Sequence, residues 1–160
     1  MVDLTQMLAG SYGSMLLADL GAEVIKIEDP QGGDPTRWLG PPFVKGENGY
    51  FTGINCNKRS VALDLRKAQG CQVLYDLVKV SDVIFSNLRP GTMERLDCDY
   101  ETLKEIDPQI IYCSLRGFSE TGPYGDRPAF DLATQALSGA MTITANLVAD
   151  QGAWASPWET

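Results

Sequence analysis

Residues 8–28 read LAGSYGSMLLADLGAEVIKIE, and this stretch decides which fold we expect. Its first half has the composition of a helix, and Ser11 or Ser14 is placed to cap it by accepting a backbone N–H. Gly21 suits the left-handed residue that ends a helix. Residues 22–27 then become apolar, which predicts a buried strand. The predicted inward stripe of the helix consists of Met15, Leu16, Leu17 and Leu20.

Residues 2–5 look like the end of an earlier strand, directly before this helix. A strand, a glycine-containing turn, a helix and a second strand form the unit from which parallel sheets are built. Further on, the pattern predicts strands over residues 61–65, 82–87 and 110–114, the last of them buried, and helices over residues 67–80, 92–96, 100–106 and 130–141. The whole chain therefore predicts an α/β fold with a Rossmann-like, doubly wound, mostly parallel sheet.

Two segments rich in glycine and proline, residues 29–53 and 117–128, read as loops. Four aromatic residues are expected to pin the first loop to the body: Trp38, Phe43, Tyr50 and Phe51. Thr92 is expected to cap the short helix that follows it. The dinucleotide fingerprint G-x-G-x-x-G is absent, which disfavours a nicotinamide cofactor.

Composition narrows the functional classes further. The chain has 160 residues, a formal net charge of −8 and no histidine. The acidic balance argues against nucleic acid or an anionic membrane as a partner, and catalysis or metal binding by histidine is excluded within these residues. The four cysteines show no CxxC spacing, so no metal site is predicted. No apolar run approaches membrane-spanning length, and we expect a cytoplasmic chain with free thiols.

A series of ordered motifs resembles the opening of the family III CoA-transferases, the group of formyl-CoA transferase and carnitine CoA-transferase. The motifs are DLTQ at residues 3–6, ADLGAEVIKIE at 18–28, GDPTR at 33–37, NCNKRS at 55–60, NLRPG at 87–91, IYCS at 111–114 and GPY at 122–124. The resemblance covers residues 1–144. Members of the family are much longer, so the chain is expected to be the first part of one, and a short N-terminal piece is expected to be missing as well.

The resemblance implies coenzyme A and acyl-CoA as substrates, a carboxylic acid as the second substrate, and no permanently bound cofactor. It also implies an interlocked homodimer in the full-length family. Nine positions match the family's coenzyme A contacts: Gln6, Met7, Leu8, Ala9, Leu63, Arg66, Asn87, Leu88 and Arg95. Tyr50 and Phe130 match positions in the acyl pocket. Many members carry a basic residue where this chain has Asp29, which weakens one contact on the adenine side.

The phosphates of coenzyme A require cations, and this acidic chain gathers several of them: Lys58, Arg59, Arg66, Lys67, Arg89 and Arg95. The alternative is that they are solvated or paired with Asp64, Glu94 or Asp97, because exposed ion pairs are common. Asp131 is likewise open to two interpretations. It is either a helix cap or an acid near the thioester. The racemase branch of the superfamily has a histidine before this acid, so Phe130 disfavours an epimerase or lyase.

In the family an aspartate attacks the acyl thioester and, through a mixed anhydride, becomes an aspartyl-CoA thioester. That aspartate lies in a Gly-Asp motif about 29 residues beyond the position of Asp131, where this chain has Thr160. The family would continue with a sequence like Met-Gly-Val-Pro-Met-Gly-Asp. Codons can be written for residues 154–160 that, read with one preceding A in the neighbouring frame, spell this heptapeptide.

We therefore expect residues 1–144 to form the coenzyme A-binding α/β domain and residues 145–160 to be a frame-shifted tail. The nucleophilic aspartate is then absent, and this polypeptide is predicted to have little or no transferase activity. The alternative from another class is a residual module that binds coenzyme A or a protein partner without catalysis.

Overall fold

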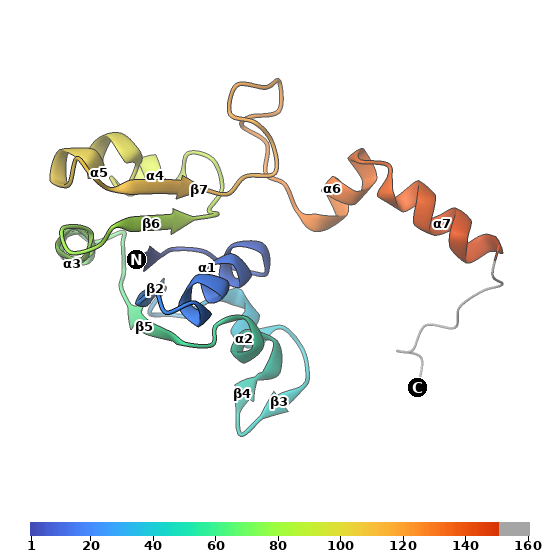
Figure 1. The fold of residues 1–160 in the computed structure, drawn as a ribbon, viewed down its shortest axis with the longest axis horizontal. Coiled ribbons are helices and arrows are strands. Elements are labelled where there is room, and N and C mark those ends of the chain that lie inside the picture. Colours follow the sequence, from blue (N-terminus) through green and yellow to red (C-terminus); the bar gives the residue numbers. More distant parts are fainter. Residues whose placement is uncertain (151–160) are drawn as a thin grey trace. The chain divides into compact units, whose positions relative to one another are not determined.

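The computed structural model describes residues 1–150, and the side chains of residues 1–145. The chain divides into two compact units, Met1–Arg116 and Gly117–Thr160 (Figure 1). The first unit holds the sheet and most of the predicted site. The predicted boundary at residue 145 stays a prediction, and residues 151–160 of the predicted tail lie outside the described residues.

Five parallel strands form the sheet of the first unit, in the order β5-β2-β1-β6-β7. The strands are β1 (Val2–Asp3), β2 (Val24–Glu28), β5 (Lys58–Ala62), β6 (Val83–Ser86) and β7 (Ile111–Ser114). Counted along the chain this order is 3-2-1-4-5, so the direction of winding reverses between β1 and β6. Such a reversal is typical of the doubly wound fold, and the predicted α/β class is confirmed.

One face of the sheet carries the apolar core. Val2, Ile27 and Ile84 point to this face and are almost fully buried. Three helices supply most of the rest of that core, α3 (Ala68–Val78), α4 (Thr92–Arg95) and α5 (Tyr100–Ile106). Their buried contributions are Leu74, Val78, Met93 and Leu103.

The other face is covered by α1 (Ala9–Asp19), which packs on β2 and β6. Side chains alternate along a strand, so Asp3 and Lys26 point away from the apolar core. Ser11 and Ser14 of α1 contact these two charged residues, and both serines are fully buried. The buried surface under α1 is therefore polar.

The predicted serine cap of α1 is wrong, because the N-cap residue is Leu8 and no side chain caps the helix. The predicted end is confirmed. Gly21 has φ +101°, its N–H donates to Ala18 O at 3.0 Å, and the N–H of Ala22 donates to Leu17 O at 3.0 Å. This pair of bonds is the Schellman pattern, which favours glycine at the left-handed position.

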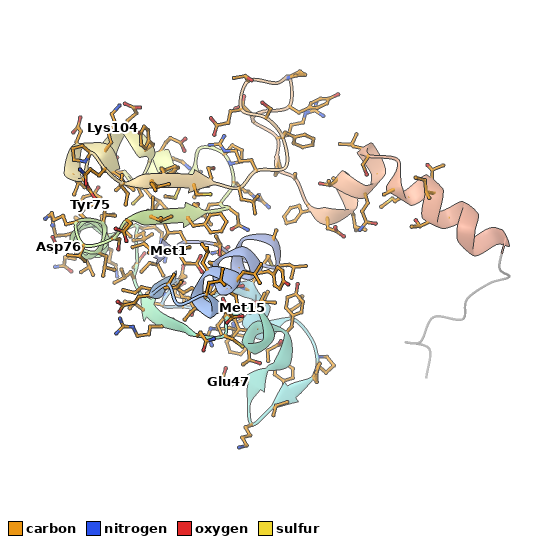
Figure 2. All side chains as sticks on the ribbon, in the orientation of Figure 1. Met1, Met15, Glu47, Tyr75, Asp76 and Lys104 are labelled. Carbon is orange, nitrogen blue, oxygen red and sulfur yellow. The ribbon has the colours of Figure 1, made fainter. Side chains whose placement is uncertain are left out.

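The predicted apolar stripe of α1 is also wrong in most of its members. Met15 is buried (labelled in Figure 2), but Leu16, Leu17 and Leu20 are 44%, 42% and 85% exposed. The inward positions belong instead to small or hydroxyl residues. At Gly10 an added Cβ would lie 2.5 Å from Thr5 Cβ, so the start of the helix lies too close to the segment after β1 for a larger side chain.

The first predicted loop contains structure of its own. It holds η1 (Pro35–Trp38), a hairpin of β3 (Phe43–Val44) and β4 (Glu47–Asn48), and α2 (Gly49–Ile54). The Asn48 side chain caps α2 by accepting from the N–H groups of Tyr50 and Phe51. Phe51 is buried as expected, whereas Trp38 and Phe43 are 72% and 51% exposed and do not pin the segment.

Three smaller predictions need correction. Thr92 is not the cap of α4, since Gly91 occupies that position with φ +74°. The β7 strand lies at the sheet edge and Ile111 is 61% exposed, so it is not the buried strand expected. Over residues 117–150 the structure has two helices, α6 (Asp131–Leu137) and α7 (Ala140–Asp150), where one was predicted, because Gly139 with φ +78° separates them.

None of the helices in the described residues 1–150 is long and apolar enough to cross a membrane. The segment over residues 117–128 is a loop, as predicted, and within it Phe118 and Tyr124 form an edge-to-face contact at 5.6 Å.

A buried leucine, Leu74, and an exposed leucine, Leu20, give a direct test of the fold. Leu74→Ala removes a side chain that is 0% exposed, and we expect it to lower the free energy of unfolding by about 2–5 kcal/mol. Leu20→Ala, at an 85% exposed position, should change it by less than about 0.5 kcal/mol. Urea denaturation followed by circular dichroism measures both. Equal losses would show that the core is assigned to the wrong face.

Candidate functional site

The carboxyl ends of all five strands meet at one edge of the sheet, and most of the predicted binding residues follow these ends. The β1–α1 loop, residues 4–8, follows β1 and contains Gln6, Met7 and Leu8. Leu63 and Arg66 follow β5, and Asn87 and Leu88 follow β6. In doubly wound sheets, ligands bind outside the carboxyl ends where the strand order reverses. Here that point lies between β1 and β6.

Asn87 bridges the two strands at this point. Its Nδ2 donates to Gln6 O at 2.7 Å, and its Oδ1 accepts from the N–H of Gln6 at 2.8 Å. The side-chain amide thus pairs with both polar groups of one backbone residue, as a neighbouring strand would. The bridge holds the β1–α1 loop against the end of β6, and sequence spacing alone gave no sign of it.

The β1–α1 loop presents two apolar side chains to solvent. Met7 has φ +61°, a left-handed conformation that only a few residues other than glycine adopt. Met7 and the following Leu8 are 37% and 50% exposed. Apolar surface beside a polar bridge suits a ligand that has both a hydrocarbon arm and hydrogen-bonding groups.

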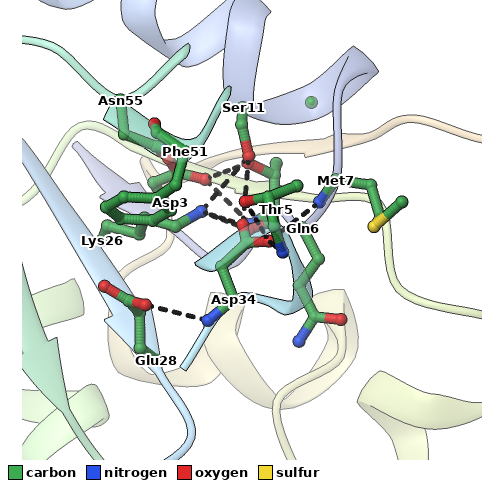
Figure 3. Close-up of polar contacts among 12 residues, drawn as sticks. Asp3, Thr5, Gln6, Met7, Ser11, Lys26, Glu28, Asp34, Phe51 and Asn55 are labelled. Atoms are coloured by element: carbon green, nitrogen blue, oxygen red, sulfur yellow. Dashed lines mark hydrogen bonds and ion pairs between the residues drawn. The ribbon is translucent and has the colours of Figure 1, made fainter. Parts of the chain in front are cut away.

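Four charged residues lie buried beneath the loop (Figure 3). Lys26 pairs with Asp34 at 2.9 Å and Lys58 pairs with Asp3 at 3.1 Å, with side-chain exposures of 2% and 0% in each pair. Burial disfavours the charged form of Lys58 and lowers its pKa. The charge of Asp3 opposes this shift but does not cancel it. In Asp34, burial opposes ionisation, but the N–H of Thr36 and the charge of Lys26 keep its pKa below the usual value.

A third buried carboxylate, Glu28, lies at the end of β2. Arg37 donates to both of its oxygens, at 2.7 and 2.8 Å, and the hydroxyl of Ser60 donates to Oε1 at 2.5 Å. Burial would raise the pKa of Glu28, but these hydrogen bonds and that from the N–H of Asp34 outweigh it and lower the pKa to about 2.

We did not expect charged residues inside this sheet. A strand covered on both faces must pair any charge that it contains, so Lys26 and Glu28 within the otherwise apolar segment 24–28 were the available signal.

Two of the exposed cations, Arg66 and Lys67, are paired with Asp64, as the alternative interpretation allowed. Arg66 Nε donates to Asp64 Oδ1 at 2.7 Å, and Arg66 also lies 3.4 Å from Asp29. Lys67 pairs with Asp64, and Arg59 with Glu23 near the opposite, amino edge of the sheet. The Arg66 side chain remains 57% exposed, so these contacts leave it accessible.

Arg95 donates through Nε to Gly91 O at 3.0 Å and through its terminal nitrogen to Thr92 Oγ1 at 3.1 Å. The thiol of Cys71 links the segment that contains Arg95 to the segment that contains Arg66. It lies 3.0 Å from Leu65 O and 3.5 Å from Leu96 O, and each of these residues is next to one of the two arginines. Leu63 and Leu88 are partly buried against the apolar core.

The remaining predicted site residues are Tyr50, Phe130 and Asp131. They belong to segments other than those that directly follow β1, β5 and β6. Tyr50 is half-buried in the first turn of α2. Phe130 and Asp131 belong to the second unit, where Phe130 is the N-cap residue of α6 and Asp131 follows it. Asp131 does not cap the helix with its side chain but accepts from Gln135 Nε2, so the interpretation as a hydrogen-bonding cap is wrong.

Within the described part of the chain, no cluster of three or more cysteines and acidic residues could hold a metal ion. The edge of the sheet instead offers a polar bridge, exposed apolar side chains and accessible guanidinium groups. This combination fits an anionic organic ligand.

A comparison with protein families shows which family this is. The model of CoA-transferase family III matches residues 1–157. The chain belongs to this family. The resemblance seen in the motifs is thereby confirmed.

Relatives and solved structures agree with this assignment. The chain is 45% identical to human succinyl-CoA:glutarate CoA-transferase over 143 residues, covering 89% of the chain and 33% of that protein. It is 48% identical over 153 residues to succinyl-CoA:mesaconate CoA-transferase of Haloarcula hispanica, covering 89% of the chain and 38% of that protein. A CaiB/BaiF family protein from Brucella suis superposes with a TM-score of 0.82 at 44% identity, covering 88% of the chain and 38% of that structure. The chain thus spans little more than a third of the length of these proteins.

Acid should weaken the fold through Glu28. Because its pKa is about 2 in the folded chain and 4.5 without these contacts, its stabilising effect is complete above pH 5 and lost as the pH falls toward 2. We expect this to remove about 3 kcal/mol of the free energy of unfolding. Glu28→Gln should flatten the loss between pH 5 and 2, as measured by urea titrations at each pH. Glu47→Gln, at a side chain that is 62% exposed, is the control and should leave the wild-type profile.

Proposed function

We propose that Met1–Arg116 binds coenzyme A along the carboxyl edge of its sheet, as part of an enzyme that moves coenzyme A between an acyl-CoA and a carboxylic acid. One observation carries the proposal. The segments that match the family's coenzyme A contacts follow β1, β5 and β6, and Asn87 joins two of them where the strand order reverses.

Coenzyme A has chemistry that suits this edge. Its pantetheine arm can lie against Met7 and Leu8, which are both exposed. Its phosphates suit Arg66 and Arg95, since guanidinium groups bind phosphate oxygens in a fixed geometry. Exchanging the ion pairs of Arg66 for a phosphate costs little, because exposed ion pairs contribute less than about 1 kcal/mol.

We further propose that the acceptor is a dicarboxylic acid, because the relatives reported above are named for glutarate and mesaconate. In the proposed reaction an aspartate carboxylate attacks the acyl thioester, which forms a mixed anhydride and releases the coenzyme A thiolate. The thiolate then attacks the aspartyl carbonyl, which forms an aspartyl-CoA thioester and releases the donor acid. The acceptor acid takes up coenzyme A by the same steps in reverse. Tyr50 and Phe130 are proposed to face the acyl group. The whole protein is proposed to act as an interlocked homodimer.

The proposal treats coenzyme A binding and coenzyme A transfer by the 160-residue polypeptide as two separate properties. Thr160 stands at the spacing expected for the aspartate, so the 160-residue polypeptide is proposed to bind coenzyme A without transferring it. Such a chain would act as a binding module, the second class considered above.

Arg66 gives a test of the binding site. We expect Arg66→Gln to weaken coenzyme A binding about tenfold in calorimetry, because one charge-assisted contact to phosphate is lost. Arg59→Gln is the matched control: this arginine is equally ion-paired and 69% exposed, but it lies near the amino edge, and its loss should not change affinity. Equal effects of both variants, or no heat from the wild-type chain at millimolar ligand, would contradict the proposal.

Transferase activity gives a second test. The 160-residue chain, incubated with succinyl-CoA and glutarate, should form no glutaryl-CoA above the uncatalysed background in a chromatographic assay. Human succinyl-CoA:glutarate CoA-transferase serves as the positive control. Sustained turnover by the 160-residue chain would refute the proposed role of the aspartate.

A further inference from the structure

The buried charges under the β1–α1 loop have no place in the proposed reaction, yet they are costly to keep. Lys26 and Asp34 are removed from water, and the desolvation of such a pair commonly outweighs its attraction. Replacing a buried pair by apolar residues is often neutral or stabilising. A pair that adds little stability can instead contribute by fixing one conformation.

The contacts of this pair point to the loop that it would fix. Lys26 Nζ donates to Thr5 O at 2.7 Å, and Asp34 Oδ1 accepts from the N–H of Met7 at 3.4 Å. The two charges therefore hold the backbone on either side of Gln6, the residue that Asn87 clamps. From Thr5 O to the N–H of Met7, four successive backbone polar groups are bonded to side chains.

The loop needs such support because of Met7. A left-handed conformation costs a residue other than glycine about 1–2 kcal/mol and persists only where its surroundings hold it. Burial of the side chain does not hold it, because Met7 is 37% exposed. The hydrogen bonds to Lys26, Asp34 and Asn87 supply that constraint.

We propose that Lys26 and Asp34 are positioning residues, which hold the β1–α1 loop in the conformation that receives coenzyme A. They touch the backbone of the loop and not the ligand. The inference rests on the proposed function for its ligand, but the conformation that it assigns to these two residues can be measured without ligand.

The chain offers a matched control in its second buried pair. Lys58 and Asp3 are as deeply buried as Lys26 and Asp34. Lys58 Nζ, however, donates to Ser11 O and Asn55 Oδ1, both at 2.8 Å, and not to the loop. The bonds of this pair to the loop come from Asp3 Oδ1, which accepts from the N–H and the hydroxyl of Thr5. The double variants Lys26→Met/Asp34→Asn and Lys58→Met/Asp3→Asn each remove one whole pair and leave no unpaired charge. In both, the asparagine keeps the Oδ1 acceptor of the original carboxylate.

Two measurements compare the variants with the wild-type chain. Hydrogen exchange at the Gln6 and Met7 amides should accelerate about tenfold in Lys26→Met/Asp34→Asn and should match the wild type in the control pair. Calorimetry should show affinity for coenzyme A about tenfold lower in the first variant and within about twofold of the wild type in the control. Urea titrations show how much stability each variant has lost.

The results separate the inference from the proposed function. If the wild-type chain binds no coenzyme A, the proposed function fails, and the exchange data alone decide whether the pair holds the loop. If Lys26→Met/Asp34→Asn binds coenzyme A as the wild type does and its loop amides exchange as in the control, the inference is overturned.

If Lys26→Met/Asp34→Asn does not fold, substitutions of Met7 test the same loop conformation. Met7→Pro cannot adopt φ +61° and also removes the N–H that donates to Asp34 Oδ1, but it leaves the Lys26 and Asp34 side chains themselves unchanged. Met7→Ala controls for the lost side chain. The inference expects Met7→Pro to bind coenzyme A about tenfold more weakly than Met7→Ala, and equal affinities would overturn it.

Discussion

The ion pair of Lys26 and Asp34 joins three segments that are distant in the sequence. Lys26 lies in the middle of β2, Asp34 begins the turn into η1, and both contact the β1–α1 loop. All buried side-chain polar atoms in the described residues have a partner. Because an unpaired charge here would cost several kcal/mol, the three segments can pack only in an arrangement that completes the network.

The sheet thus separates two tasks between its faces. The face toward α3, α4 and α5 is apolar and supplies most of the burial that stabilises the unit. The face toward α1 contains Asp3, Lys26 and the α1 serines, and it orders the loop at the carboxyl edge. Alternation along β1 and β2 places both kinds of residue on the same strands, so core and site are built from neighbouring residues of the same two strands.

Sequence alone predicted the order of the five sheet strands and of helices α1, α3, α4 and α5, because their apolar runs and the Gly21 stop are local signals. It missed η1, the β3–β4 hairpin and α2, which lie in a segment that reads as a loop. It failed where a tertiary contact overrides the local signal. The leucines of α1 suggested an apolar inner face, but the charges on β1 and β2 require hydroxyl and small side chains there. The binding segments could be named from family motifs, whereas the Asn87 bridge and the buried pairs link residues up to 81 positions apart and have no local pattern.

The central proposal is that coenzyme A binds at the carboxyl edge of the sheet. Titration of the isotope-labelled 160-residue chain with coenzyme A, followed through backbone amide shifts, tests this most directly. The account predicts shifts that concentrate in residues 6–9, 63–66 and 87–88, with little change at Glu23 and Arg59 near the opposite edge. Shifts centred on the amino edge or on α5, or no shifts at millimolar ligand, would contradict it.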